Sequence, residues 1–141
     1  MNEKCLTVAA TMDNLDRVIG FVEEQLNEEA CPVKIQGQII VSLEELYVNV
    51  VNYAYDGAVG ECSLYMSILP CDNERKMVLT IKDRGKPFNP LLRQDPDITL
   101  SADERQIGGL GIYMVKKSMD QVTYEYDSGY NALTICKAWQ I

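Results

Sequence analysis

Polar residues recur at helical spacing in the otherwise apolar stretch from Ile39 to Ala54. At about 100° per residue, one arc of about 80° on a helix would hold Ser42, Glu45, Asn49 and Asn52. Glu45 and Asn49 are four residues apart and point the same way. A carboxylate beside a neutral oxygen donor suits a hydrated Mg²⁺ with phosphates and a reacting hydroxyl nearby. Taken alone, however, the stripe favours a merely exposed polar face.

A second motif lies where the alternating segment "MVLTIKDRGKPFNP" stops at Asp83. A carboxylate at the end of a strand can accept a hydrogen bond from a ligand amine, such as the exocyclic amino group of adenine. Gly85, two residues later, would let a flat ring approach the backbone. The alternative is an ordinary Asp-x-Gly turn, which this motif alone favours.

The third motif is a glycine cluster, Gly108, Gly109 and Gly111, in "RQIGGLGIYMVKKSMD". Neither the P-loop spacing nor the dinucleotide-binding spacing fits it. An amphipathic run follows at once, so the glycines open a helix. The free N–H groups and the positive dipole end of a helix start favour anions such as phosphates. A flexible hinge at the end of a loop is the alternative.

Strand and helix patterns alternate around these motifs. Apolar spacing predicts helices over about residues 13–30, 34–55 and 110–119. Alternating or β-branched segments predict strands over about 5–12, 62–69 and 76–83, and a hairpin over about 121–139 that turns at Ser128-Gly129. The polar segment over about 90–107 is long enough to suggest a lid. We expect one α+β domain, 1–141: a two-layer sandwich with a mixed, mostly antiparallel sheet and about three helices on one face.

The composition narrows the class of partner. The chain has 141 residues, a formal net charge of −8 and a sequence pI of about 4.5, which argues against nucleic acid or an anionic membrane surface as partner. It has no histidine, which excludes Ser-His and Cys-His nucleophile pairs. Its five scattered cysteines are typical of reduced, buried thiols. No apolar run approaches the roughly 20 residues of a membrane span, so we expect a cytoplasmic protein.

In this order and spacing, the motifs resemble those of the GHKL ATPase superfamily, and within it those of the anti-sigma-factor serine/threonine kinases. "EELYVNVVNYAY" resembles the N box, "DRGKPFNP" the first glycine box and "IGGLGIYMVKKSMD" the second. "LTICK" resembles the closing strand, where the family often has a threonine near the adenine. The resemblance implies a Bergerat-type fold that binds ATP between the second helix, the lid and the glycine boxes.

The resemblance also implies roles for individual residues. Glu45 would be the base that activates the attacking hydroxyl, Asn49 the Mg²⁺ ligand and Asp83 the adenine contact. Further nucleotide-binding positions would be Asn52, Gly85, Lys86, Arg105, Gly108, Gly109, Leu110, Gly111, Ile112 and Thr134. Asn52 departs from the family pattern, because relatives often have a basic residue there. Asn89 departs as well, since "PFDP" is common in place of "PFNP".

The function that the resemblance implies is phosphorylation of a serine or threonine on an anti-anti-sigma (STAS-type) partner, together with control of a bacterial sigma factor. Family members often form dimers, and either the apolar side of "DRVIGFVEEQL" or an open sheet edge could supply a homodimer interface. One alternative is a nucleotide-sensing module that sequesters its partner without kinase activity. Another is a stand-alone ATPase, in which Glu45 would activate water.

Overall fold

The computed structural model of the chain describes residues 3–92 and 109–141. The elements run in the order β1 (Lys4–Ala9), α1 (Leu15–Glu28), α2 (Val33–Asn49), β2 (Glu61–Cys71), β3 (Glu74–Asp83), α3 (Gly109–Ser118), β4 (Gln121–Asp127) and β5 (Tyr130–Gln140). Short 3-10 helices at Met12–Asn14 (η1) and Pro90–Leu92 (η3) and a π-helical turn at Val50–Ala54 (η2) complete the described part.

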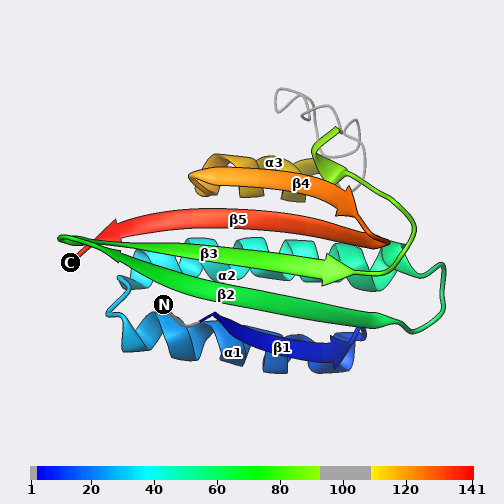
Figure 1. Cartoon of the computed structure of the whole chain (residues 1–141), viewed down its shortest axis with the longest axis horizontal. Helices are drawn as coiled ribbons and strands as arrows, with labels where there is room; N and C mark the ends of the chain where they lie inside the picture. The colour runs from blue at the N-terminus through cyan, green and yellow to red at the C-terminus, as the bar shows by residue number, and fades with distance from the viewer. Residues whose placement is uncertain (1–2, 93–108) are drawn as a thin grey trace.

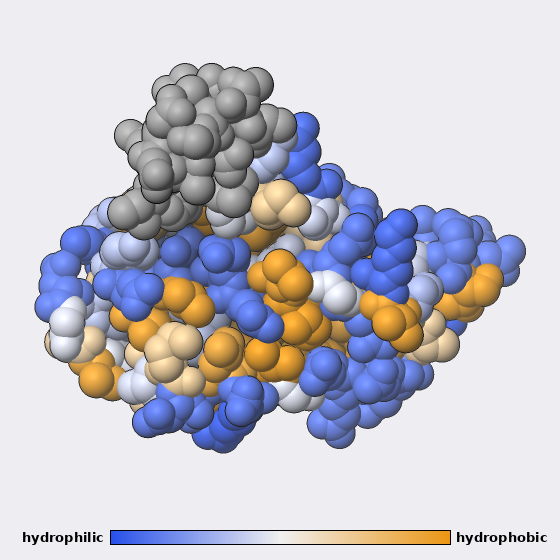
Figure 2. All heavy atoms as spheres, turned by 180° about the vertical axis from the view of Figure 1, so that it is seen from behind, coloured by the Kyte–Doolittle hydropathy of each residue, from blue (hydrophilic) through white to orange (hydrophobic). Residues whose placement is uncertain are grey.

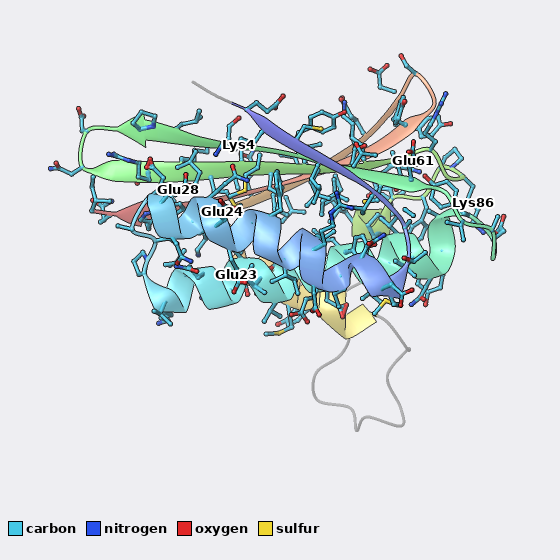
Figure 3. All side chains as sticks on the ribbon, turned by 90° about the horizontal axis from the view of Figure 1, so that it is seen from below. Lys4, Glu23, Glu24, Glu28, Glu61 and Lys86 are labelled. Carbon is cyan, nitrogen blue, oxygen red and sulfur yellow. The ribbon has the colours of Figure 1, made fainter. Side chains whose placement is uncertain are left out.

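The strands form one sheet in the order β1-β2-β3-β5-β4, and each of the four pairings is antiparallel. The helices cover one face of this sheet, and no other described element covers the opposite face, which we call the bare face (Figure 1; Figure 3). The predicted two-layer α+β sandwich is therefore confirmed. Among the described residues the sheet is antiparallel throughout, where we had expected a mixed, mostly antiparallel one.

The β4–β5 hairpin sets the register of the C-terminal strands. It turns at Ser128 (φ 55°) and Gly129 (φ 86°), and two consecutive left-handed residues match the twist of a two-residue hairpin. The predicted turn is thus confirmed. Asp127 pairs with Tyr130, and β5 in turn places Asn131 opposite Asp83 of β3. This register decides which side chains of β5 meet the end of β3.

The core lies between the sheet and the helices. Val18, Val22 and Leu26, on the apolar side of α1, are fully buried. Burying each such side chain stabilises the fold by about 1.5–3 kcal/mol. The side of "DRVIGFVEEQL" that we considered as a homodimer interface is therefore already occupied by the core.

The outer surface of the helical layer is only partly polar. Apolar side chains gather between hydrophilic ones on this face (Figure 2). Val33 and Val41 of α2 and Met114 of α3 are among the exposed apolar residues. No helix among residues 3–92 and 109–141 is long and apolar enough to cross a membrane.

The cysteines yield a first testable prediction. All five are free thiols, but only Cys31, Cys62 and Cys136 are buried, so the expectation of buried thiols is wrong for Cys5 and Cys71. Burial raises the pKa of Cys31 to about 11, and burial together with nearby Asp83 raises the pKa of Cys62 to about 12. Because the thiolate is the reactive form, we expect an alkylating reagent at pH 8 to modify two thiols of the native protein quickly.

Mass spectrometry of timed samples would locate the modified residues. The same reagent in denaturant serves as the control, since unfolding must make all five thiols reactive. Rapid modification of Cys62 in the native protein would contradict its placement in the core.

Candidate functional site

A cavity opens at the end of the sheet where β3 finishes and β5 begins. It encloses about 470 Å³, part of which is open to solvent. Leu46, Asn49 and Tyr53 line it from the helical layer, and Asp83, Phe88 and Leu133 line it from the sheet and the loop after β3. A largely apolar cavity with a few polar groups is the usual form of a small-molecule site, and this one suits a flat aromatic base.

Asp83 is the buried carboxylate of this cavity. It is the last residue of β3 and is 7% exposed. Its Oδ1 atom accepts a hydrogen bond from the Gly85 backbone N–H at 2.8 Å and a second from Asn131 Nδ2 at 2.9 Å. Its Oδ2 atom has no hydrogen-bond partner among the described residues. The Asp-x-Gly turn and the ligand-facing carboxylate, which the sequence presents as alternatives, are thus compatible in this structure.

Position 85 requires a glycine because there is no room for a side chain, and not because of its backbone dihedral angles. A Cβ atom at this position would lie 2.2 Å from the carbonyl oxygen of Ala54. That same oxygen accepts a hydrogen bond from the Lys86 backbone N–H at 3.1 Å. The loop after β3 is therefore docked directly on the π-helical turn η2. Ala54 and Lys86 both line the cavity.

The π-helical turn also changes which residues of the N box reach the cavity. Its hydrogen bonds span five residues instead of four, so the residues after Asn49 are rotated relative to an α-helix. Tyr53 lines the cavity, and its ring lies 6.5 Å from that of Phe88. Asn52 is exposed and does not line the cavity. Its predicted contact with the nucleotide stays a prediction.

Glu45 meets the second glycine box. A Cβ atom on Gly111 would lie 1.9 Å from Glu45 Oε2 and 2.2 Å from its Cδ, so the first turn of α3 packs directly on this carboxylate. The N–H groups of a first helical turn lack intrahelical partners, and the dipole there is positive, which favours an anion. Glu45 also lies one helical turn before Asn49, which lines the cavity. The structure thus brings the N box and Gly111 together.

None of the other predicted positions of the second glycine box has a described side chain that lines the cavity. Arg105 and Gly108 lie outside the described residues, and Gly109 and Leu110 are described only as the first two residues of α3. The Ile112 side chain is 3% exposed and belongs to the hydrophobic core, so it does not line the cavity. Only the backbone of Ile112 remains a candidate for a ligand contact.

Lys86 lines the rim of the cavity and is exposed. It lies at the same end of the molecule as the C-terminal end of α2 (Figure 3). Its Nζ atom is 2.7 Å from Asp56 Oδ1. Because both side chains are exposed, this ion pair is weak and exchanges easily with water or with a bound anion.

Thr134 does not reach the cavity. Its hydroxyl lies 2.8 Å from that of Thr80, on the bare face of the sheet. Side chains alternate along a strand, and the neighbouring Leu133 is the residue that lines the cavity. The prediction that Thr134 contacts the nucleotide therefore does not fit the structure, and we leave it out of the proposed site.

Sequence reasoning missed Asn131 and Tyr124, which both line the cavity. Asn131 is 6% exposed and bonds directly to Asp83. Asparagine is depleted in strands, so an Asn near the start of a predicted strand was a usable signal. Tyr124 carried no such signal, because tyrosine is common in strands.

With this geometry in view, comparison with known proteins gives the family. Residues 8–137 match the histidine kinase-like ATPase domain. The chain belongs to this family. The prediction of a GHKL ATPase from the three motifs is confirmed, and the family description makes the chain an ATP-binding domain.

The named relatives are protein kinases that act on serine or threonine, which is the reaction class that the sequence predicted. The serine/threonine-protein kinase BtrW of Bordetella bronchiseptica is 20% identical over 92% of this chain and 89% of its own length. The serine-protein kinases RsbW of Bacillus licheniformis and Staphylococcus aureus are 29% and 30% identical over 63% of this chain. The chain spans only 56% and 57% of the length of these two RsbW proteins.

A solved structure supports the fold. The RsbU and RsbW domains of Rv1364c from Mycobacterium tuberculosis superpose with a TM-score of 0.64 and 17% sequence identity. The match covers 97% of this chain and 32% of that one. The histidine kinase-like ATPase fold thus accounts for nearly the whole chain.

Proposed function

We propose that this protein is an ATP-dependent serine/threonine kinase that phosphorylates an anti-anti-sigma (STAS-type) partner and thereby regulates a sigma factor. The observation that carries the proposal is the contact between Glu45 and Gly111, one helical turn from the cavity that ends at Asp83. The names of the BtrW and RsbW relatives support the reaction class. Residues 1–141 would form a single catalytic domain that works in the cytoplasm.

In this proposal the adenine occupies the apolar cavity. Asp83 accepts a hydrogen bond from its exocyclic amine, and the rings of Tyr53 and Phe88 flank the opening. The phosphates extend toward Asn49 and the first turn of α3. The free N–H groups there stabilise the negative charge that the transferring phosphoryl group carries.

The residues present fit a magnesium ion held mainly by phosphates and water. Asn49 offers an amide oxygen, which is one of the hard oxygen ligands that Mg²⁺ prefers. No group of three or more potential ligands occurs among His, Cys, Asp and Glu in residues 3–92 and 109–141. Mg²⁺ commonly binds through one or two protein oxygens plus substrate phosphates, so this sparse set suffices. The ion would neutralise phosphate charge, and Asn49 would hold it.

Glu45 is the proposed general base. It is half-buried and lies against the first turn of α3. It would accept the proton of the partner's serine or threonine hydroxyl as the oxygen attacks the γ-phosphate. The chain has no histidine that could take this role.

The test is transfer of labelled γ-phosphate from ATP to a STAS-type protein encoded beside this one. We expect one phosphate per partner, located on a serine or threonine, and no transfer when EDTA removes Mg²⁺. A partner in which that residue is replaced by alanine is the control. Absence of transfer to every neighbouring STAS-type protein, with ATP bound, would contradict the kinase proposal.

One observation favours the alternative of a nucleotide-sensing module without kinase activity. Asn52 stands where relatives often have a basic residue, and it is exposed and outside the cavity. Such a module would bind its partner and respond to ATP without transferring phosphate. Phosphate release from ATP without a partner would instead support a stand-alone ATPase.

We further propose that the protein forms a homodimer through a sheet edge. The edge strands β1 and β4 each present backbone groups that no described strand pairs, and such edges favour association. Light scattering at several concentrations tests this, since a monomeric mass throughout would contradict it.

A further inference from the structure

The side chain of Asn131 makes several hydrogen bonds at the end of the cavity where Asp83 lies. Its Nδ2 atom lies 2.9 Å from Asp83 Oδ1, 2.9 Å from the carbonyl oxygen of Lys86 and 3.3 Å from that of Gly85. One amide nitrogen therefore ties β5 to the Asp83 carboxylate and to the loop that follows it. Asn131 is almost fully buried, so these bonds form away from competing water.

The amide oxygen of Asn131 is engaged as well. It accepts hydrogen bonds from the Phe88 backbone N–H at 3.1 Å and from the hydroxyl of Tyr124. An asparagine side chain offers two N–H groups and two lone pairs, and all of them are in use here. Asn131 thus has no free group with which to bind a ligand, and any effect on a ligand must pass through its neighbours.

The neighbour through which Asn131 would affect a ligand is Asp83. Two donors, Asn131 Nδ2 and the Gly85 N–H, both bind Oδ1 and so fix the rotation of the carboxylate. Oδ2 is then the oxygen left without a partner among the described residues. Removing Asn131 would leave a single bond on Oδ1, so the carboxylate could turn and its Oδ2 would no longer be held in one direction.

We propose that Asn131 is a positioning residue that makes the site select adenine. This inference rests on the proposed placement of ATP, in which Oδ2 of Asp83 accepts a hydrogen bond from the 6-amino group. Guanine carries an oxygen acceptor at the equivalent ring position, which a fixed carboxylate repels. Asn131 acts on this choice through Asp83 and does not touch the nucleotide.

The experiment compares the binding of ATP with that of purine riboside triphosphate, which lacks the 6-amino group, and with that of GTP. A hydrogen bond to a charged group implies a preference for ATP of about tenfold to a hundredfold in the wild type. Asn131→Ala should reduce this preference to within about threefold, by weakening ATP binding while binding of purine riboside triphosphate stays nearly unchanged. A merely structural role would weaken both nucleotides equally and would overturn the proposal.

Two further variants keep the test decisive. Asn131→Leu has nearly the same volume but has no group that can donate to Asp83; it should lose the preference even if Asn131→Ala does not fold. Thr134→Ala changes the same strand on the bare face and should keep the wild-type preference. If Asp83→Asn fails to weaken ATP, the placement of ATP is wrong. If Asp83→Asn weakens ATP but both Asn131 variants keep the preference, only the role of Asn131 is wrong.

Discussion

Replacing Glu45 by glutamine is expected to lower phosphate transfer to the partner by about 10²- to 10⁴-fold, the range typical of a lost general base. Glutamine has nearly the same size and shape as glutamate, so the contact with Gly111 is preserved. It cannot accept the proton of the attacking hydroxyl at neutral pH. Because Glu45 does not line the apolar cavity, ATP affinity should stay within about threefold of the wild type.

Single-turnover transfer from labelled ATP measures the chemical step, and calorimetric titration measures ATP affinity. Glu44→Gln is the matched control, because Glu44 is the adjacent carboxylate on α2 but is exposed to solvent. We expect Glu44→Gln to transfer phosphate at the wild-type rate. Transfer by Glu45→Gln within tenfold of the wild type would remove Glu45 from the role of base.

The same variant separates the kinase from the sequestering module. In the module, Glu45→Gln would leave both partner binding and the regulatory effect intact. In the kinase, the variant would still bind its partner but could not phosphorylate it. The activity of the sigma factor would then no longer be switched. A reporter for the sigma factor, together with a partner-binding assay, distinguishes these outcomes.

The fold was largely predictable because its layers follow from apolar periodicity. Val18, Val22 and Leu26 of α1 share one helical face, and the structure buries all three. The same reasoning extended the second helix to about residue 55 and missed the π-helical turn. Nothing in "VVNYA" distinguishes the two helix types, and in the structure the distant loop after β3 docks on this turn at Ala54. A long-range contact of this kind cannot be read from local periodicity.

The errors at the closing strand have a different cause. Leu133, Ile135 and Trp139 are separated by even numbers of residues, so they lie on one face of β5, and all three are buried. This alternation already placed Thr134 on the opposite face. The resemblance of "LTICK" to the family's closing strand predicted the opposite. Asn131 lies on the same face of β5 as Leu133. Its hydrogen bond to Asp83, however, depends on the register of β3 and β5, which the sequence did not specify.

The Gly111→Ala variant is expected to lose activity without losing stability. The added methyl group would lie 1.9 Å from Glu45 Oε2, so one of the two must move. The group in its path is the far end of a flexible side chain, and Glu45 can swing aside at little cost to the fold. Alanine inside a helix also stabilises the helix by about 1 kcal/mol relative to glycine. Transfer should therefore fall about as far as in Glu45→Gln, with a melting temperature near that of the wild type.

Two other glycines supply the comparison. At Gly85 the added methyl group meets backbone atoms of Ala54, which cannot swing aside, so Gly85→Ala should destabilise the fold by about 1–3 kcal/mol. At Gly37 of α2 no atom lies within 4 Å of the added methyl group, so Gly37→Ala should stabilise the helix and leave transfer unchanged. Combining Gly111→Ala with Glu45→Gln should cost no more activity than either change alone, because both disable the same carboxylate. Additive losses in that double variant would mean that Gly111 acts on the reaction by a route other than Glu45.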